Sequence, residues 1–110
     1  MKTKRWKFHV PIYDLDVKVI LTDDIRPEYK REFNFDLNDL HAACLGYEGR
    51  KYVLFFEPKY VKKGIVAHEI FHLTHRILEK CSANFDAAHH ECGAYLCEYL
   101  TDKIFKMLDL

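Results

Sequence analysis

Two histidines and a glutamate lie close together in this sequence, in the run His68-Glu69-Ile70-Phe71-His72. On a helix, side chains four positions apart share one face, with Cβ atoms about 5–6 Å apart. Both imidazoles can therefore reach one tetrahedral cation, to which a Zn–N bond is about 2.0–2.1 Å long. Glu69 is offset by about 100° from His68 around the helix axis. We therefore expect its carboxylate beside the cation, where it can take a proton from a bound water.

The motif lies inside a long helical pattern that runs from about residue 60 to residue 81. Apolar residues recur there at three- and four-residue spacing, as an amphipathic helix requires; they are Ile65, Val66, Ile70, Leu73, Ile77 and Leu78. The two histidines fall outside this stripe. We therefore predict a helix with one apolar face and one histidine face. H-E-x-x-H on a helix is the pattern of zinc peptidases, and the alternative is a solvated histidine-rich face without metal.

A catalytic zinc ion takes three protein ligands and one water molecule, so the histidine pair needs a third side chain. A second helical pattern follows the first, with Asn84 or Asp86 as its predicted N-cap. The connection over residues 80–85 is short, so we expect the two helices to form an antiparallel hairpin. The returning helix then passes the face that carries the histidines.

Glu91 is the predicted third ligand. It begins the pattern Glu91-x-x-Ala94-Tyr95, and the small side chain of Ala94 lets two helices approach closely. The alternatives are His90, which we place next after Glu91, and then Asp86 and His89, because carboxylates and imidazoles both bind zinc. If none of these binds metal, Glu91 is a carboxylate that interacts with the helix dipole in the first turn.

These motifs, over about residues 60–100, resemble the gluzincins, in which a glutamate from a helix downstream of H-E-x-x-H completes the zinc site. The chain looks most like minimal single-domain gluzincins and the zinc-peptidase domains of the ImmA/IrrE type, and it is also similar to small phage- and prophage-encoded H-E-x-x-H proteins. The resemblance implies that His68, His72 and Glu91 hold one Zn²⁺ per chain and that Glu69 is the catalytic base. In thermolysin-like relatives a carboxylate follows the ligand glutamate by four residues, whereas Tyr95 stands at that position here.

Two further residues are candidates for the catalytic site. A developing oxyanion needs a donor besides the metal, and both Tyr95, one turn after Glu91, and His75 could supply it. His75 lies about 10 Å along the helix axis from His68, so we do not expect it to be a zinc ligand. The alternatives are that Tyr95 packs against the motif helix and that His75 is an exposed side chain with no role.

Composition limits the other classes of function. A chain of 110 residues with 49% hydrophobic and 15% aromatic residues is typical of one globular domain, here residues 1–110. The 17 acidic residues balance the 17 basic ones, so we expect no binding to nucleic acid or to an anionic membrane. We see no apolar segment typical of a signal peptide or a membrane span and expect a cytoplasmic protein. The four cysteines are expected to be free thiols.

The first half of the chain has the pattern of strands. We predict strands over residues 6–12 and 17–21. A turn at residues 23–28 is expected to begin a short helix, with Pro27 in its first turn. Residues 41–56 are expected to form a hairpin around Glu48-Gly49. The predicted fold class is α+β: a small zincin-like domain with a three- to four-stranded sheet followed by two long antiparallel helices.

The predicted function is zinc-dependent hydrolysis of peptide bonds, with a peptide or protein substrate. In zincins the strand that precedes the motif helix pairs with an extended peptide, and the resemblance gives that role to one strand of the 41–56 hairpin, since strand addition supplies affinity through backbone bonds. The alternatives are an ordinary hairpin, and a catalytically weak or inactive zinc-stabilised module that binds a peptide or protein without cutting it.

Overall fold

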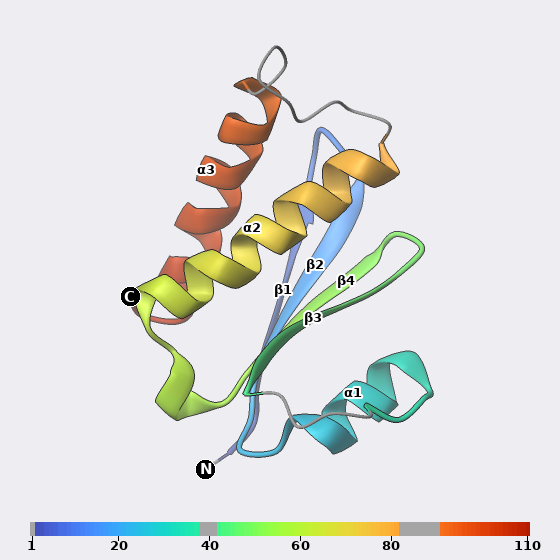
Figure 1. The fold of residues 1–110 in the computed structure, drawn as a ribbon, viewed down its shortest axis with the longest axis vertical. Coiled ribbons are helices and arrows are strands. Elements are labelled where there is room, and N and C mark those ends of the chain that lie inside the picture. Colours follow the sequence, from blue (N-terminus) through green and yellow to red (C-terminus); the bar gives the residue numbers. More distant parts are fainter. Residues whose placement is uncertain (1, 38–41, 82–90) are drawn as a thin grey trace. The chain divides into compact units, whose positions relative to one another are not determined.

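The computed structural model describes residues 2–37, 42–81 and 91–110. The elements follow the order β1 (Lys4–Val10), β2 (Leu15–Leu21), α1 (Ile25–Phe33), β3 (Ala43–Glu48), β4 (Lys51–Phe56), the 3₁₀ turn η1 (Pro58–Tyr60), α2 (Lys63–Lys80) and α3 (Glu91–Met107) (Figure 1). This order confirms the predicted α+β class, with a four-stranded sheet followed by two long helices.

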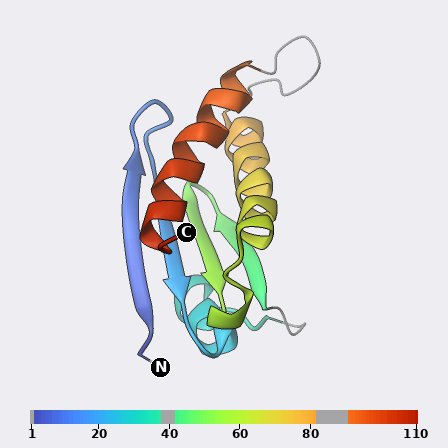
Figure 2. The same ribbon diagram turned by 90° about the vertical axis from the view of Figure 1, so that its left-hand side faces the viewer.

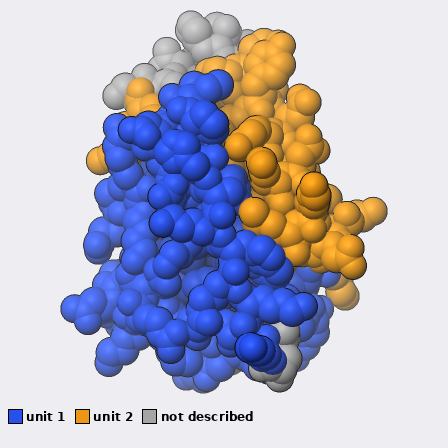
Figure 3. Space-filling model, turned by 180° about the vertical axis from the view of Figure 1, so that it is seen from behind, with its two compact units in different colours: residues 1–61 blue, residues 62–110 orange. Residues whose placement is uncertain are grey.

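The chain divides into two compact units, which Figure 3 colours separately. The sheet unit, Met1–Val61, holds all four strands, α1 and η1, and the helical unit, Lys62–Leu110, holds α2 and α3. The expectation of a single domain over residues 1–110 stays a prediction.

The sheet has the strand order β1-β2-β4-β3. β1 and β2 pair antiparallel, as do β3 and β4, whereas β2 and β4 pair parallel in the middle of the sheet. The β3–β4 hairpin confirms the one predicted around Glu48-Gly49, although β3 begins later than expected. Gly49 is the first of its two turn residues and has φ of 62°, which a two-residue type II′ turn requires of that position.

Helix α1 begins and ends with recognisable caps. The Asp24 carboxylate accepts a hydrogen bond from the backbone N–H of Arg26 at the start, and Asn34 adopts the left-handed conformation at the end. Pro27 lies in the first turn, as predicted. This turn tolerates proline because its backbone N–H groups have no partner within the helix. The helix is longer than the short one expected from residues 23–28.

An apolar cluster forms between α1 and the two central strands. Ile25 and Phe33 of α1 are buried with Ile20 of β2 and with Val53 and Phe55 of β4. The alternation of side chains along a strand places these three strand residues on one face of the sheet. Tyr52, Leu54 and Phe56, on the other face of β4, are buried as well, so burial on both faces accounts for the near-continuous apolar run of this strand.

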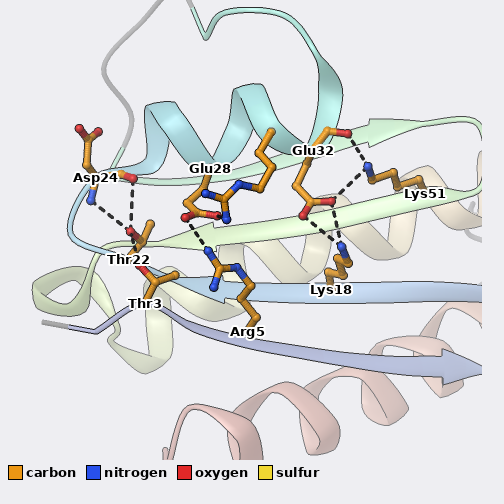
Figure 4. A network of polar contacts seen from close by, with 9 residues as sticks. Thr3, Arg5, Lys18, Thr22, Asp24, Glu28, Glu32 and Lys51 are labelled. Atoms are coloured by element: carbon orange, nitrogen blue, oxygen red, sulfur yellow. Dashed lines mark hydrogen bonds and ion pairs between the residues drawn. The ribbon is translucent and has the colours of Figure 1, made fainter.

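Ion pairs also connect α1 to the sheet (Figure 4). Glu28 accepts a hydrogen bond of 2.7 Å from the Arg5 guanidinium of β1. Glu32 lies 3.0 Å from the Lys18 ammonium of β2 and 3.1 Å from the Lys51 ammonium of β4. These carboxylates are largely buried, so their pairing with cations removes the cost of an isolated buried charge.

The helical unit contains two helices that contact each other and run in opposite directions (Figure 2). Helix α2 spans most of the predicted range 60–81, and η1 occupies the region just before it. The predicted apolar stripe is buried except for Ile65, which is partly exposed. On α3 the buried positions are Gly93, Leu96, Leu100 and Ile104. Asn84 and Asp86, the predicted N-caps of the second helix, lie outside the described residues.

Candidate metal centre

The imidazoles of His68 and His72 lie against each other on α2. Their Nε2 atoms are 3.2 Å apart, and the ring centroids are separated by 4.8 Å with the planes at 75°. The four-residue spacing produces this approach directly, because it places both side chains one turn apart on the same face. Both residues are exposed to solvent, and the His68 side chain retains 67% of its accessible surface.

The spacing of the two nitrogens fits a shared zinc ion. Two ligands that each lie about 2.05 Å from a tetrahedral centre are separated by about 3.3–3.4 Å. The observed 3.2 Å is close to that value. Without a cation, one neutral ring can donate its N–H to the other at the same distance. The donor set and its spacing therefore suit zinc, although the same contact also forms a hydrogen bond.

Glu69 lies beside this pair. Its Oε2 atom is 4.0 Å from His68 Nε2, and its side chain is only 11% exposed. That distance exceeds a direct hydrogen bond, yet a water molecule in contact with one of these atoms can also contact the other. The sequence places Glu69 between the exposed and buried faces of the helix, so its carboxylate reaches the histidines from a largely buried position.

The histidine face lies opposite the apolar face of α2. The buried positions of the helix are Val66, Glu69, Ile70, Leu73, Thr74, Ile77 and Leu78, whereas His68, His72 and His75 are exposed. This confirms the predicted division into an apolar stripe and a histidine stripe. The hydroxyl of the buried Thr74 donates to the Ile70 carbonyl, so its polar atom is satisfied within the helix.

Glu91, the predicted third ligand, is the first residue of α3 and is exposed. Over residues 2–37, 42–81 and 91–110, no group of three or more His, Cys, Asp or Glu side chains is arranged to hold a metal ion. Among these residues, Glu91 forms no such group with His68 and His72. Helix α2 continues to Lys80, which lies about 12 Å along the axis beyond His72.

The alternative ligands Asp86, His89 and His90 lie outside the described residues. The assignment of the third ligand to Glu91 thus stays a prediction.

Tyr95 and His75 are both exposed. Tyr95 retains 67% of its surface, and within the described part of the chain no hydrogen bond or ring contact joins it to His68 or His72. His75 lies on the same face of α2 as the pair, one turn further along. Their roles as oxyanion donors stay predictions.

Phe71 is a residue of this site that sequence reasoning did not single out. Its ring centroid lies 6.0 Å from that of His72, and the residue is 55% exposed. The signal for it was present in the helical pattern, since Phe71 is a large apolar residue that falls outside the buried stripe.

The sheet unit carries a second candidate site, an open hollow of about 520 Å³ whose lining includes Lys7, His9, Asp16, Lys18, Arg50 and Lys51. Most of its charged side chains already have partners: Lys7 and His9 contact Asp16, and Lys18 and Lys51 contact Glu32 of α1. A hydrogen bond from His9 and the nearby Lys7 ammonium keep the pKa of Asp16 below its usual value, against the opposing effect of burial. Arg50 donates to the carbonyls of Tyr13 and Asp14. This internal pairing makes the hollow a weaker candidate than the histidine pair.

Comparisons with known proteins add no relatives: no protein-family model, curated protein or solved structure matches this chain. In the part of the chain that the structure describes, no helix has the length and apolar character needed to cross a membrane.

Proposed function

We propose that this protein is a zinc-dependent peptide hydrolase of the gluzincin type. The observation that carries this proposal is the geometry on α2: two imidazole nitrogens 3.2 Å apart, with a largely buried carboxylate 4.0 Å from one of them. Two metal-binding nitrogens and an adjacent base are the groups that hydrolysis by an activated water requires. A structural zinc site needs no carboxylate at that position.

Each residue has a defined role in this proposal. His68 and His72 hold the metal through their Nε2 atoms, and Glu91 is the proposed third ligand. Zinc, when bound, lowers the pKa of a coordinated water toward about 7 and polarises the substrate carbonyl. Glu69 accepts the proton of the attacking water and donates it to the leaving amine. Tyr95 and His75 are the proposed donors to the oxyanion oxygen.

We propose that the substrate is a peptide or a protein segment in extended form. β3 is at one edge of the sheet and pairs only with β4 among the described strands. An extended peptide can add to such an edge through backbone hydrogen bonds, which hold it without a deep pocket. One strand of the hairpin that we expect to bind substrate, β3, therefore lies at a sheet edge.

The first test is the zinc content of the purified protein. After dialysis against metal-free buffer, elemental analysis is expected to give about one zinc per chain, and the double substitution His68→Ala with His72→Ala is expected to give none. Incubation of the zinc-loaded protein with a mixed peptide library, followed by mass spectrometry, then tests hydrolysis. If the protein holds no zinc even after it is reconstituted with zinc, the proposed hydrolase function is wrong.

The exposure of the pair favours a second candidate function, a zinc-stabilised module that binds a peptide or protein without cutting it. His68 and His72 lie on the outward face of α2, where a partner can reach them. This candidate shares the zinc content with the first but not the cleavage. Zinc bound at one per chain, with library peptides captured and recovered intact, would support it against the hydrolase.

A further inference from the structure

Phe71 is the one large apolar side chain of α2 that is exposed. Its surface is 55% accessible, whereas the other large apolar residues of the helix, Ile65, Val66, Ile70, Leu73, Ile77 and Leu78, are buried or partly buried. A single exposed apolar residue is common on protein surfaces. The position of Phe71 beside the proposed metal ligands is what distinguishes it from other such residues.

Phe71 and Glu69 flank the histidine pair on opposite sides. At about 100° per residue, Glu69 lies about 100° from His68 in one direction around the helix, and Phe71 lies about 60° from it in the other. The Phe71 ring is tilted at 66° to the His72 ring, with centroids 6.0 Å apart. The pair is thus bordered by a carboxylate on one side and by an aromatic ring on the other.

A peptide whose carbonyl lies at the histidine pair must pass close to this ring. An extended peptide advances about 3.3 Å per residue. The 6.0 Å between the ring centroids of Phe71 and His72 therefore corresponds to no more than two residues of substrate. An apolar substrate side chain at that point gains from removing the exposed surface of Phe71 from water. A charged side chain gains less there than an apolar one, because it loses part of its hydration.

We propose that Phe71 is a specificity-determining residue that selects peptides with a large apolar side chain within two residues of the cleaved bond. This inference rests on the proposed hydrolase function and names the substrate class for that site. Phe71 has no part in holding the metal or in moving protons, so it changes the choice of peptide and leaves zinc binding unchanged.

The test compares the wild-type protein with Phe71→Ala, Phe71→Leu and the control Phe35→Ala. Phe35 is also a phenylalanine and is 50% exposed, but it belongs to the sheet unit and contacts Tyr29. For each variant, kcat/KM is measured on two peptides that differ only by phenylalanine or lysine beside the bond that the library identifies. Affinity for both peptides is also measured by calorimetry in the Glu69→Gln background, where we expect hydrolysis to be too slow to deplete the peptide.

The wild type is expected to prefer the phenylalanine peptide. Phe71→Ala should reduce that preference about 10-fold, the usual scale for loss of an apolar contact, whereas Phe71→Leu and Phe35→Ala keep most of it. The same order should hold for affinity, with zinc content unchanged throughout. Alanine is a strong helix former, so circular dichroism should show α2 intact.

The outcomes separate the two proposals. If the wild type cleaves with a preference and Phe71→Ala keeps that preference, only the proposed role of Phe71 is overturned. The same holds if the wild type cleaves both peptides equally well. A wild type that binds no zinc or cleaves no library peptide overturns the hydrolase and, with it, this inference.

Discussion

Two helices of this protein each carry a glutamate that is almost removed from solvent, and the two glutamates differ in their neighbours. Glu32 of α1, whose side chain is 7% exposed, contacts the ammonium groups of Lys18 and Lys51. Glu69 of α2, 11% exposed, lies beside the imidazole of His68. The first is surrounded by cations from two neighbouring strands, and the second borders a pair of potential metal ligands.

The comparison shows that burial alone does not identify a functional carboxylate. The ammonium groups of Lys18 and Lys51 both contact the Glu32 carboxylate, and these contacts tie α1 to the sheet. An imidazole, by contrast, can offer a lone pair to a metal ion. The chemistry of the neighbouring side chain therefore separates a carboxylate that stabilises the fold from one that we propose as a base.

Substitution of Glu69 by glutamine gives the largest expected effect. We expect hydrolysis to fall by about 10²–10⁴-fold, the usual contribution of a general base, because an amide cannot accept the water proton. Zinc content and melting temperature should stay near those of the wild type. The matched control is Glu32→Gln, which should keep hydrolysis. Equal rates for Glu69→Gln and the wild type would exclude Glu69 from the mechanism.

Substitution of Glu91 by alanine tests the proposed third ligand. Changes in groups that only support a ligand typically cost 10–100-fold in metal affinity, so loss of a ligand should cost at least about 100-fold. Competition with a chromogenic chelator measures this affinity, and Glu98→Ala on the same helix is the control. Retained affinity in Glu91→Ala would direct the search to His90, Asp86 and His89.

Gly46 of the sheet unit and Gly64 of the helical unit also differ in how closely they are packed. A Cβ atom on Gly46 of β3 would lie 2.4 Å from a ring carbon of Phe33 and 3.0 Å from one of Tyr29, whereas one on Gly64 of α2 would meet nothing within 4 Å. We expect Gly46→Ala to lower the free energy of unfolding by about 1–3 kcal/mol through overpacking.

Gly64→Ala is the matched control and should be neutral or stabilising by up to about 1 kcal/mol, because alanine favours a helix. Thermal and urea denaturation measure both values. Equal effects of the two substitutions would mean that Phe33 and Tyr29 move aside at little cost.

The smallest expected effect is the acid sensitivity that Glu32 confers. Burial acts to raise its pKa, but the hydrogen bonds from Lys18 and Lys51 outweigh burial and hold the pKa below its usual value of 4.5. A carboxyl with a lowered folded pKa contributes stability above its unfolded pKa, and this contribution is lost as pH falls through the folded value. Destabilisation by protonation of Glu32 should therefore appear below about pH 4.5.

Glu32→Gln should remove that part of the acid dependence and lower stability at pH 7 by about 1 kcal/mol. Glu48→Gln, an exposed carboxyl of the same unit, is the control. Urea denaturation between pH 3 and pH 7, on the order of five pH values, measures the dependence. Parallel stability curves for Glu32→Gln and the wild type would contradict this role.

Local patterns were sufficient to predict several elements of this fold. The three- and four-residue spacing of apolar residues predicted α2 and separated its buried face from His68 and His72. The Glu48-Gly49 pair predicted the β3–β4 turn, since glycine readily adopts the positive φ found there. In each case the information lies within a few neighbouring residues.

Features that join distant parts of the chain could not be predicted in this way. The parallel pairing of β2 with β4 and the approach of Glu28 and Glu32 to the strands depend on which elements meet in space. Whether Glu91 can reach the histidine pair also depends on such a long-range arrangement. Its distance from His72 depends on how far α2 continues before the chain turns, and the spacing of the motif does not encode that length.

The central pairing of β2 with β4 has a consequence for the order of folding. The β1–β2 and β3–β4 hairpins close over short loops, whereas the parallel register that joins Val17 to Tyr52 encloses α1 and β3. Closing a long loop costs more chain entropy than closing a hairpin, and such non-local contacts slow folding. We therefore expect the two hairpins to form first and their union to limit the folding rate of the sheet. Until then, the strand edges of β2 and β4 are open to pairing with other chains during synthesis.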